Sequence, residues 1–232
     1  MTYNNIKENI YKGRIMFKRI TKKQCSIARQ RANALIRDVQ QKLKEKYKFA
    51  VRMVGSGAWG TMIEDDQGEY DLDYQLFLSK NSPLYKKNNA FPTPTDIKND
   101  FISAFTKCLK GKENIENSTT AITLVNEDNK PYHMDFVIIK TLPENNLIIR
   151  RNNKKETPQH NEFTWNELPT WNDAYDYFKS LSPEEKQYLI EEIIIPKKQT
   201  EKAKAENDPS KISSSALFVR EVNNYKCQHK KK

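Results

Sequence analysis

Residues Tyr70–Leu78 (YDLDYQLFL) alternate between apolar and polar side chains, with Phe77 as the one apolar residue on the polar face. A period of two is typical of a β-strand with one buried face and one face open to solvent. The apolar face consists of Leu72, Tyr74, Leu76 and Leu78, and the opposite face of Asp71, Asp73, Gln75 and Phe77. A chain that contains this segment is expected to build a sheet around it.

Asp71 and Asp73 project from one face of this strand, separated by two residue rises of about 3.3 Å each. Two carboxylates this close repel each other, and one tends to keep its proton unless a positive charge lies between them. Mg²⁺ relieves the repulsion, because this hard cation takes carboxylate oxygens, water and phosphate as ligands. The alternative interpretation of a bare D-x-D is the solvated face of an amphipathic strand.

A glycine-rich segment precedes this strand. The strand predicted at residues 49–54 (FAVRMV) leads directly into Gly55-Ser56-Gly57. Glycines let the backbone come close to phosphates and present its N–H groups, and the Ser56 hydroxyl adds a further donor. The segment therefore indicates a phosphate-binding turn, with an ordinary turn as the alternative.

A third acid lies in the apolar segment HMDFVII, residues 133–139. Asp135 is flanked there by Phe136 and Val137, and a carboxylate on a buried strand is costly unless it is paired or coordinates a cation. A salt bridge or an edge position is the alternative. Phosphoryl transfer from a nucleotide to a hydroxyl requires a phosphate cradle and acids that hold two metal ions, and these segments supply both.

The remaining pattern predicts a mixed sheet with helices. We expect an amphipathic helix at residues 21–47, a loop at 79–94, a helix from Thr93–Asp96 to a C-cap at Gly111, strands at 120–125 and 132–139, and a turn at 127–130. The stretch 150–170 is polar and of low periodicity.

The C-terminal part is predicted to be helical. A capping box at Ser182–Glu185 opens a helix that is expected to end near Ile195, because Pro196 follows. Residues 197–212 are charged and expected to be exposed, and a last helix is predicted at 214–226. The division that follows is a core at residues 1–150 and a helical part with a basic tail at 151–232.

Composition restricts the class of protein. No apolar run is long enough to span a membrane, and the N-terminus lacks the apolar core of a secretion signal. The three cysteines show no metal or disulfide spacing, which is typical of a cytoplasmic protein with reduced thiols. The formal net charge of +10 favours polyanionic partners such as nucleoside triphosphates or nucleic acid. An AT-rich genome would explain the same lysines without any such partner.

The order of these motifs resembles a known group. Gly55-Ser56, Gly60-Thr61, Asp71-Leu72-Asp73 and then Asp135 are similar to the signature of the DNA polymerase β-like nucleotidyltransferase superfamily. The form G-S-x-x-x-G-T followed by D-L-D is most similar to the CD-NTases, the bacterial cyclic GMP-AMP synthase-like and oligoadenylate synthase-like enzymes of antiphage signalling. The resemblance covers roughly residues 20–140.

The resemblance implies an α+β fold, with a polymerase β-like core of a mixed sheet flanked by helices and a short helical C-terminal part. Gly55 and Ser56 would bind the triphosphate of a substrate such as ATP, and Thr61 would support their loop. Two Mg²⁺ or Mn²⁺ ions would be held by the three acids, which are also the catalytic residues: Asp71, Asp73 and Asp135. An effector protein would respond to the product. Base-stacking candidates are Tyr175, Tyr177, Phe178 and Tyr188, and phosphate-binding candidates are Lys179 and Lys186.

Two other functions remain open at this point. The first is nucleotidyl transfer to RNA, a protein or a small molecule, although the stretch between Ser56 and Asp71 is longer than in the small antibiotic-modifying members. The second is a catalytically idle module that binds nucleic acid through its basic surface. The three intact acids weigh against that second function. Residues 136–232 are fewer than the CD-NTases usually have in this part, so the resemblance leaves open whether the product is cyclic or linear.

Overall fold

The computed structural model describes residues 17–110, 113–126, 132–153, 162–168, 172–205 and 207–229. The chain divides into two compact units. The sheet unit comprises Thr21–Trp59 and Tyr70–Thr170, and the helical unit comprises Met1–Ile20, Gly60–Glu69 and Trp171–Lys232. Each unit is described by itself below.

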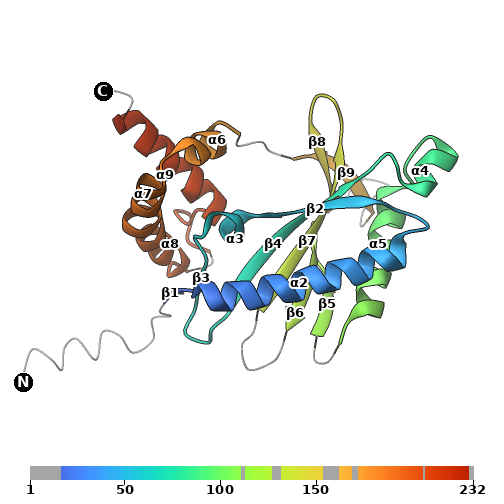
Figure 1. Ribbon diagram of the computed structural model, residues 1–232, viewed down its shortest axis with the longest axis horizontal. Coiled ribbons are helices and arrows are strands. Elements are labelled where there is room, and N and C mark those ends of the chain that lie inside the picture. Colours follow the sequence, from blue (N-terminus) through green and yellow to red (C-terminus); the bar gives the residue numbers. More distant parts are fainter. Residues whose placement is uncertain are drawn as a thin grey trace, which may run out of the picture. The chain divides into compact units, whose positions relative to one another are not determined.

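A mixed sheet forms the centre of the sheet unit (Figure 1). Its strands follow the order β2-β4-β7-β6-β5, with β8 beside β7 and β9 beside β8. The strands are β2 (Phe49–Val54), β4 (Tyr70–Leu78), β5 (Glu113–Asn117), β6 (Ile122–Asn126), β7 (Tyr132–Thr141), β8 (Asn146–Arg151) and β9 (Phe163–Glu167). Strands β4 and β7 run parallel, and every other pair in this sheet is antiparallel. The mixed α+β architecture predicted from the sequence is confirmed.

Strand β4 has the bounds that its alternation predicts, and its apolar side chains are buried as expected. Leu72, Tyr74 and Leu76 face the core together with Met134 and Phe136 of β7. Phe136 stacks on Tyr74, with ring centres 5.5 Å apart. The acids of β4 and β7 therefore lie on the opposite face of the sheet.

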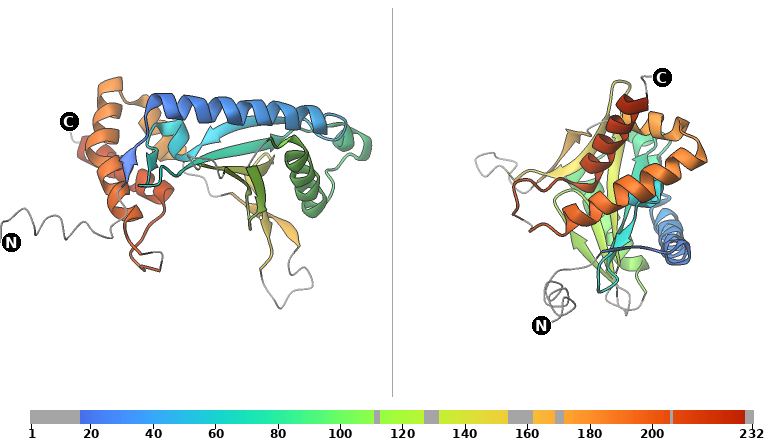
Figure 2. Two further views of the ribbon diagram at one scale, coloured as in Figure 1. Left: turned by 90° about the horizontal axis from the view of Figure 1, so that it is seen from below. Right: turned by 90° about the vertical axis from the view of Figure 1, so that its left-hand side faces the viewer.

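Two helices cover the apolar face, and Figure 2 shows the longer one running along the strands. Helix α2 (Lys22–Leu43) begins at a capping box formed by Thr21 and Gln24. Helix α5 (Pro94–Cys108) begins at the cap Thr93, and its Phe105 ring contacts Phe136 at 4.5 Å. The C-cap of α5 is Leu109, and the predicted cap Gly111 lies outside the described residues.

Some regular structure escaped the sequence pattern. The predicted loop at 79–94 contains a short helix, α4 (Pro83–Asn88), and the polar residues Glu113–Asn117 form strand β5 against β6. The stretch 150–170, which showed no periodicity, contains β9 and the end of β8. The predicted turn at 127–130 lies outside the described residues.

The helical unit contains helices α6 (Asn172–Ser180), α7 (Pro183–Tyr188), α8 (Ile195–Lys202) and α9 (Ser214–His229), and the short paired strands β1 (Lys18–Arg19) and β3 (Ile63–Glu64). The capping box at Ser182 and Glu185 is present as predicted. The basic end Lys230–Lys232 lies outside the described residues.

The prediction that Pro196 ends its helix is wrong. A π-helical segment, η1 (Leu189–Ile194), joins α7 to α8, and Pro196 lies in the first turn of α8. Proline is tolerated there because the first N–H groups of a helix have no intrahelical acceptor. The wider π turn thus lets the chain continue as a helix to Lys202.

The charged segment 197–212 is also less exposed than expected. Lys198 is buried, and its Nζ donates to the carbonyl of Thr61 at 3.1 Å. The boundary predicted at residue 150 does not coincide with the two units, because β8 and β9 extend the sheet beyond it. Among the described residues, no helix is long and apolar enough to cross a membrane.

Candidate active site

The three acids predicted from the sequence meet on one face of the sheet. In the parallel pair β4–β7, Asp73 is the register partner of Asp135, and Asp71 is the register partner of His133. Side chains at paired positions of neighbouring strands project from the same face, and so do residues two apart on one strand. The acidic cluster Asp71, Asp73 and Asp135 therefore shares the face opposite α2 and α5.

Asp135 is half-buried and hydrogen-bonded. The Thr123 hydroxyl, on the neighbouring strand β6, donates to its Oδ1 at 2.6 Å. Burial raises the pKa of the Asp135 carboxyl above its ordinary value, and the charge of Asp71 acts in the same direction. The bond from Thr123 and the charges of His133 and Lys98 oppose this change. A carboxyl with a raised pKa accepts a proton more readily, which suits a general base.

Asp71 is the more exposed member of the cluster, with 52% of its side chain accessible. Its Oδ1 lies 3.7 Å from Nδ1 of His133. Neither His133 nor Thr123 was predicted as a site residue from the sequence. His133 lies two residues before Asp135 on the same face of β7, and Thr123 lies opposite Asp135 on β6. These positions could have identified both residues as neighbours of the acid.

Gly55 and Ser56 begin the glycine turn, the short helix α3 (Gly55–Trp59) that follows β2 directly. Gly55 has a φ of +61°, a backbone conformation that residues other than glycine rarely adopt. A Cβ on Gly55 would lie 2.4 Å from Oδ2 of Asp73. Glycine is therefore required here, because the backbone of the turn lies against a carboxylate of the acidic cluster.

Thr61 belongs to the other unit. It is buried in the helical unit, where its carbonyl accepts a hydrogen bond from Lys198. Its predicted support of the glycine turn stays a prediction.

The donor chemistry of the acidic cluster suits a hard divalent cation, since carboxylate oxygens on one face are the ligands that Mg²⁺ and Mn²⁺ take. As the side chains stand, the described part of the chain contains no group of three or more His, Cys, Asp or Glu close enough together to hold a metal ion. The three carboxylates project from one face of the sheet, but their side chains would have to rotate before all three could reach one ion.

The predicted base and phosphate contacts all lie in the helical unit. Phe178 is buried, and both it and Tyr175 contact the ring of Phe218. Lys226 lies 5.4 Å from the ring of Tyr177, while Tyr188 is 54% exposed. Lys179 pairs with Asp176 at 3.0 Å, and Lys186 donates to the carbonyl of Lys179. Most of these six side chains therefore make contacts within the helical unit, as residues that stabilise its fold would do.

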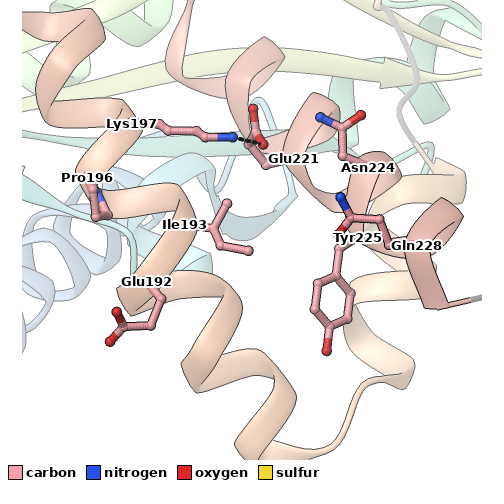
Figure 3. Close-up of a pocket in the computed structure, with 8 residues that line it drawn as sticks. All are labelled: Glu192, Ile193, Pro196, Lys197, Glu221, Asn224, Tyr225 and Gln228. Carbon is pink, nitrogen blue, oxygen red and sulfur yellow. Dashed lines mark hydrogen bonds and ion pairs between the residues drawn. The ribbon is translucent and has the colours of Figure 1, made fainter.

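A pocket of about 330 Å³ also lies in the helical unit, between η1, α8 and α9 (Figure 3). Its wall contains the buried carboxylate of Glu221, which pairs with Lys197 at 2.5 Å and with Arg220 at 2.9 Å. The acid in this pocket is thus already neutralised by two cations. The acidic cluster remains the better candidate for catalysis.

A buried lysine, Lys98, interacts electrostatically with Asp135 of the acidic cluster. Lys98 of α5 is fully buried, and its Nζ donates to the carbonyl of Thr120 at 2.8 Å and lies 5.2 Å from the ring centre of Phe163. Burial, reinforced by the charge of Arg151, lowers the pKa of Lys98 to about 7, although Asp135 acts in the opposite direction.

This lowered pKa predicts that stability rises with pH. Between about pH 7 and the ordinary lysine pKa, the unfolded chain binds a proton that the folded chain has released. The free energy of unfolding should therefore gain up to about 1.4 kcal/mol per pH unit from this group. Urea unfolding from pH 6.5 to 9 would measure the slope in the parent and in Lys98→Met. The variant should show the smaller slope, and equal slopes would contradict the prediction.

The chain has the fold of solved CD-NTase structures, as the resemblance in the sequence implied. Three solved structures illustrate the likeness. The chain resembles Vibrio cholerae DncV cyclic AMP-GMP synthase in complex with nonhydrolyzable GTP, with a TM-score of 0.61 and 14% identity over 92% of this chain and 69% of that one.

The second is the CD-NTase CdnG of Bradyrhizobium diazoefficiens in complex with GTP, with a TM-score of 0.53 and 15% identity over 89% of this chain and 59% of that one. The third is the STING-associated CdnE c-di-GMP synthase of Capnocytophaga granulosa, with a TM-score of 0.58 and 16% identity over 91% and 64%. The chain thus spans 59% to 69% of the length of these proteins. At such identities the likeness establishes the fold. No family model and no curated protein matches the sequence.

Proposed function

We propose that this chain is a metal-dependent nucleotidyltransferase that condenses nucleoside triphosphates into a cyclic or short linear oligonucleotide. The observation that carries the proposal is the register of β4 and β7, which aligns Asp73 with Asp135 while Gly55 contacts Asp73. The solved structures with this fold include cyclic dinucleotide synthases and complexes with GTP, which supports nucleotide chemistry.

Each residue has a role in this proposal. The backbone N–H groups of Gly55 and Ser56, with the Ser56 hydroxyl, bind the triphosphate. Asp71, Asp73 and Asp135 would hold two Mg²⁺ or Mn²⁺ ions. When bound, these ions supply positive charge for the triphosphate and for the leaving pyrophosphate. Asp135 would take the proton of the attacking hydroxyl.

The released oligonucleotide would act as a signal to an effector protein in antiphage defence, as the resemblance implies. The basic composition would add weak binding to nucleic acid, and that binding would decrease steeply as salt increases. Binding that does not depend on salt would contradict this electrostatic explanation.

The direct test is incubation of the purified chain with Mg²⁺ or Mn²⁺ and a mixture of α-labelled nucleoside triphosphates. We expect pyrophosphate release and label that resists phosphatase, and mass spectrometry of the product would identify its bases and linkage. Label that travels with an added RNA or protein would point to transfer onto that acceptor. No pyrophosphate release with any mixture would contradict the proposed function and favour a binding module.

A further inference from the structure

An arginine of helix α2, Arg29, contacts the glycine turn. Nη2 of the half-buried Arg29 donates to the carbonyl of Gly57 at 2.5 Å. Gly57 is buried in the turn, two residues after the glycine that contacts Asp73. The guanidinium group of Arg29 therefore links helix α2 to the backbone of α3.

A second donor of this guanidinium group, Nε, has no hydrogen-bond partner among the residues that the structure describes. This Nε is buried, and the same holds for the hydroxyl of Tyr74, the residue that follows Asp73. Among the ion pairs formed within the described ranges, none includes Arg29.

An arginine buried in this way is costly for the fold alone. A buried donor left without a partner destabilises the folded chain, and a half-buried charge without an acid adds to that cost. Because no acid in the described part of the chain forms an ion pair with it, the positive charge of Arg29 remains directed at the turn. An anion bound on the other side of the turn would feel this charge in a medium less polar than water.

We propose that Arg29 is a positioning residue for the nucleotide: it fixes the glycine turn so that the donors of Gly55 and Ser56 face the triphosphate. This inference rests on the proposed function and deepens it. Arginine suits the role because its planar fork stays charged and is preorganised, whereas the flexible lysine side chain donates as a point charge. The turn then needs little ordering when the triphosphate binds.

The test compares Arg29→Gln and Arg29→Lys with Arg37→Gln, a matched control on the exposed face of the same helix. We expect KM for the nucleoside triphosphate to rise about tenfold or more in Arg29→Gln, because the glycine turn then has to be ordered when the triphosphate binds. The increase should be smaller in Arg29→Lys and absent in Arg37→Gln. A kcat that stays closer to the parent value than KM would place the effect on binding.

Hydrogen exchange gives a second readout that does not depend on turnover. The amides of Ser56 to Trp59 should exchange faster in both Arg29 variants than in Arg37→Gln, in protein shown to be folded by its melting temperature. Unchanged exchange together with an unchanged KM would overturn the inference and leave the proposed function standing. A parent protein that releases no pyrophosphate would remove the proposed function, and the exchange data alone would then decide whether Arg29 positions the turn. Arg29→Lys keeps the test open if Arg29→Gln does not fold.

Discussion

Asp73→Asn is expected to reduce nucleotidyl transfer by roughly 10²-fold or more while leaving the fold intact. The change keeps the shape of the side chain and removes the charge that the proposed ions require. Losing one electrostatic contact that forms in the transition state typically costs roughly 10²–10³ in rate. Asp71→Asn should have a comparable effect, because both acids project from the same face of β4.

Stability should respond in the opposite direction. Asp71 raises the pKa of Asp135, which means that charges in the acidic cluster repel one another in the folded chain. Removing one charge relieves that repulsion, so the melting temperature of either variant should equal or exceed that of the parent. Asp38→Asn, at an exposed acid of α2, is a suitable control because it removes a carboxylate away from the cluster.

Thermal melts with and without Mn²⁺ provide a readout besides turnover. An ion that binds the folded chain raises its melting temperature by mass action, and this increase should be smaller in Asp71→Asn and Asp73→Asn than in Asp38→Asn. A strong loss of stability in the two β4 variants, with an unchanged response to Mn²⁺, would mean that these acids are structural.

The strand that carries two of these acids could be predicted to the residue, because alternation is a local property. Strand β4 buries every second side chain against α2 and α5, and its sequence records that one-sided burial. The same reasoning failed for β5, whose residues ENIEN carry little apolar alternation. This strand is defined by hydrogen bonds to β6, and such pairing leaves little trace in its own composition.

The helix through Pro196 illustrates a different limit. A proline within a helical pattern normally marks its end, since the ring removes a hydrogen bond and clashes with the preceding turn. Here the preceding turn is the wider π-helical segment η1, and α8 begins directly after it. The chain therefore stays helical through Pro196. That adjustment depends on how the neighbouring helices pack, and no pattern of single residues reports it.

Some residues of the candidate site could not be predicted from the sequence. The motif indicated that Asp71, Asp73 and Asp135 belong together, but not that Thr123 orients Asp135 or that Arg29 holds the turn. Arg29 is one of several basic residues on α2, and its sequence context does not separate it from the exposed Arg37. Such roles arise only when the sheet, the helix and the turn are assembled.

Gly55→Ala is expected to damage both stability and activity, and for two separable reasons. The first is the backbone, because a φ of +61° costs an alanine roughly 1–2 kcal/mol. The second is steric, since the new methyl group would lie 2.4 Å from Oδ2 of Asp73. Asp73 would have to move, and a misplacement of about 1 Å in a catalytic group can cost roughly 10²-fold in rate.

A matched variant separates the two causes. Gly68→Ala carries a similar backbone cost at a φ of +84°, but its nearest atom, Oε2 of Glu64, lies 4.0 Å from the new Cβ. Gly55→Ala should therefore be less stable than Gly68→Ala in urea unfolding. In an Asp73→Ala background, which removes the clashing oxygen, most of that difference should disappear, because residues in contact show such coupling in a double-mutant cycle. If the cost of Gly55→Ala is the same with and without the Asp73 carboxylate, the turn and the acidic cluster are not in contact and the shared site does not exist.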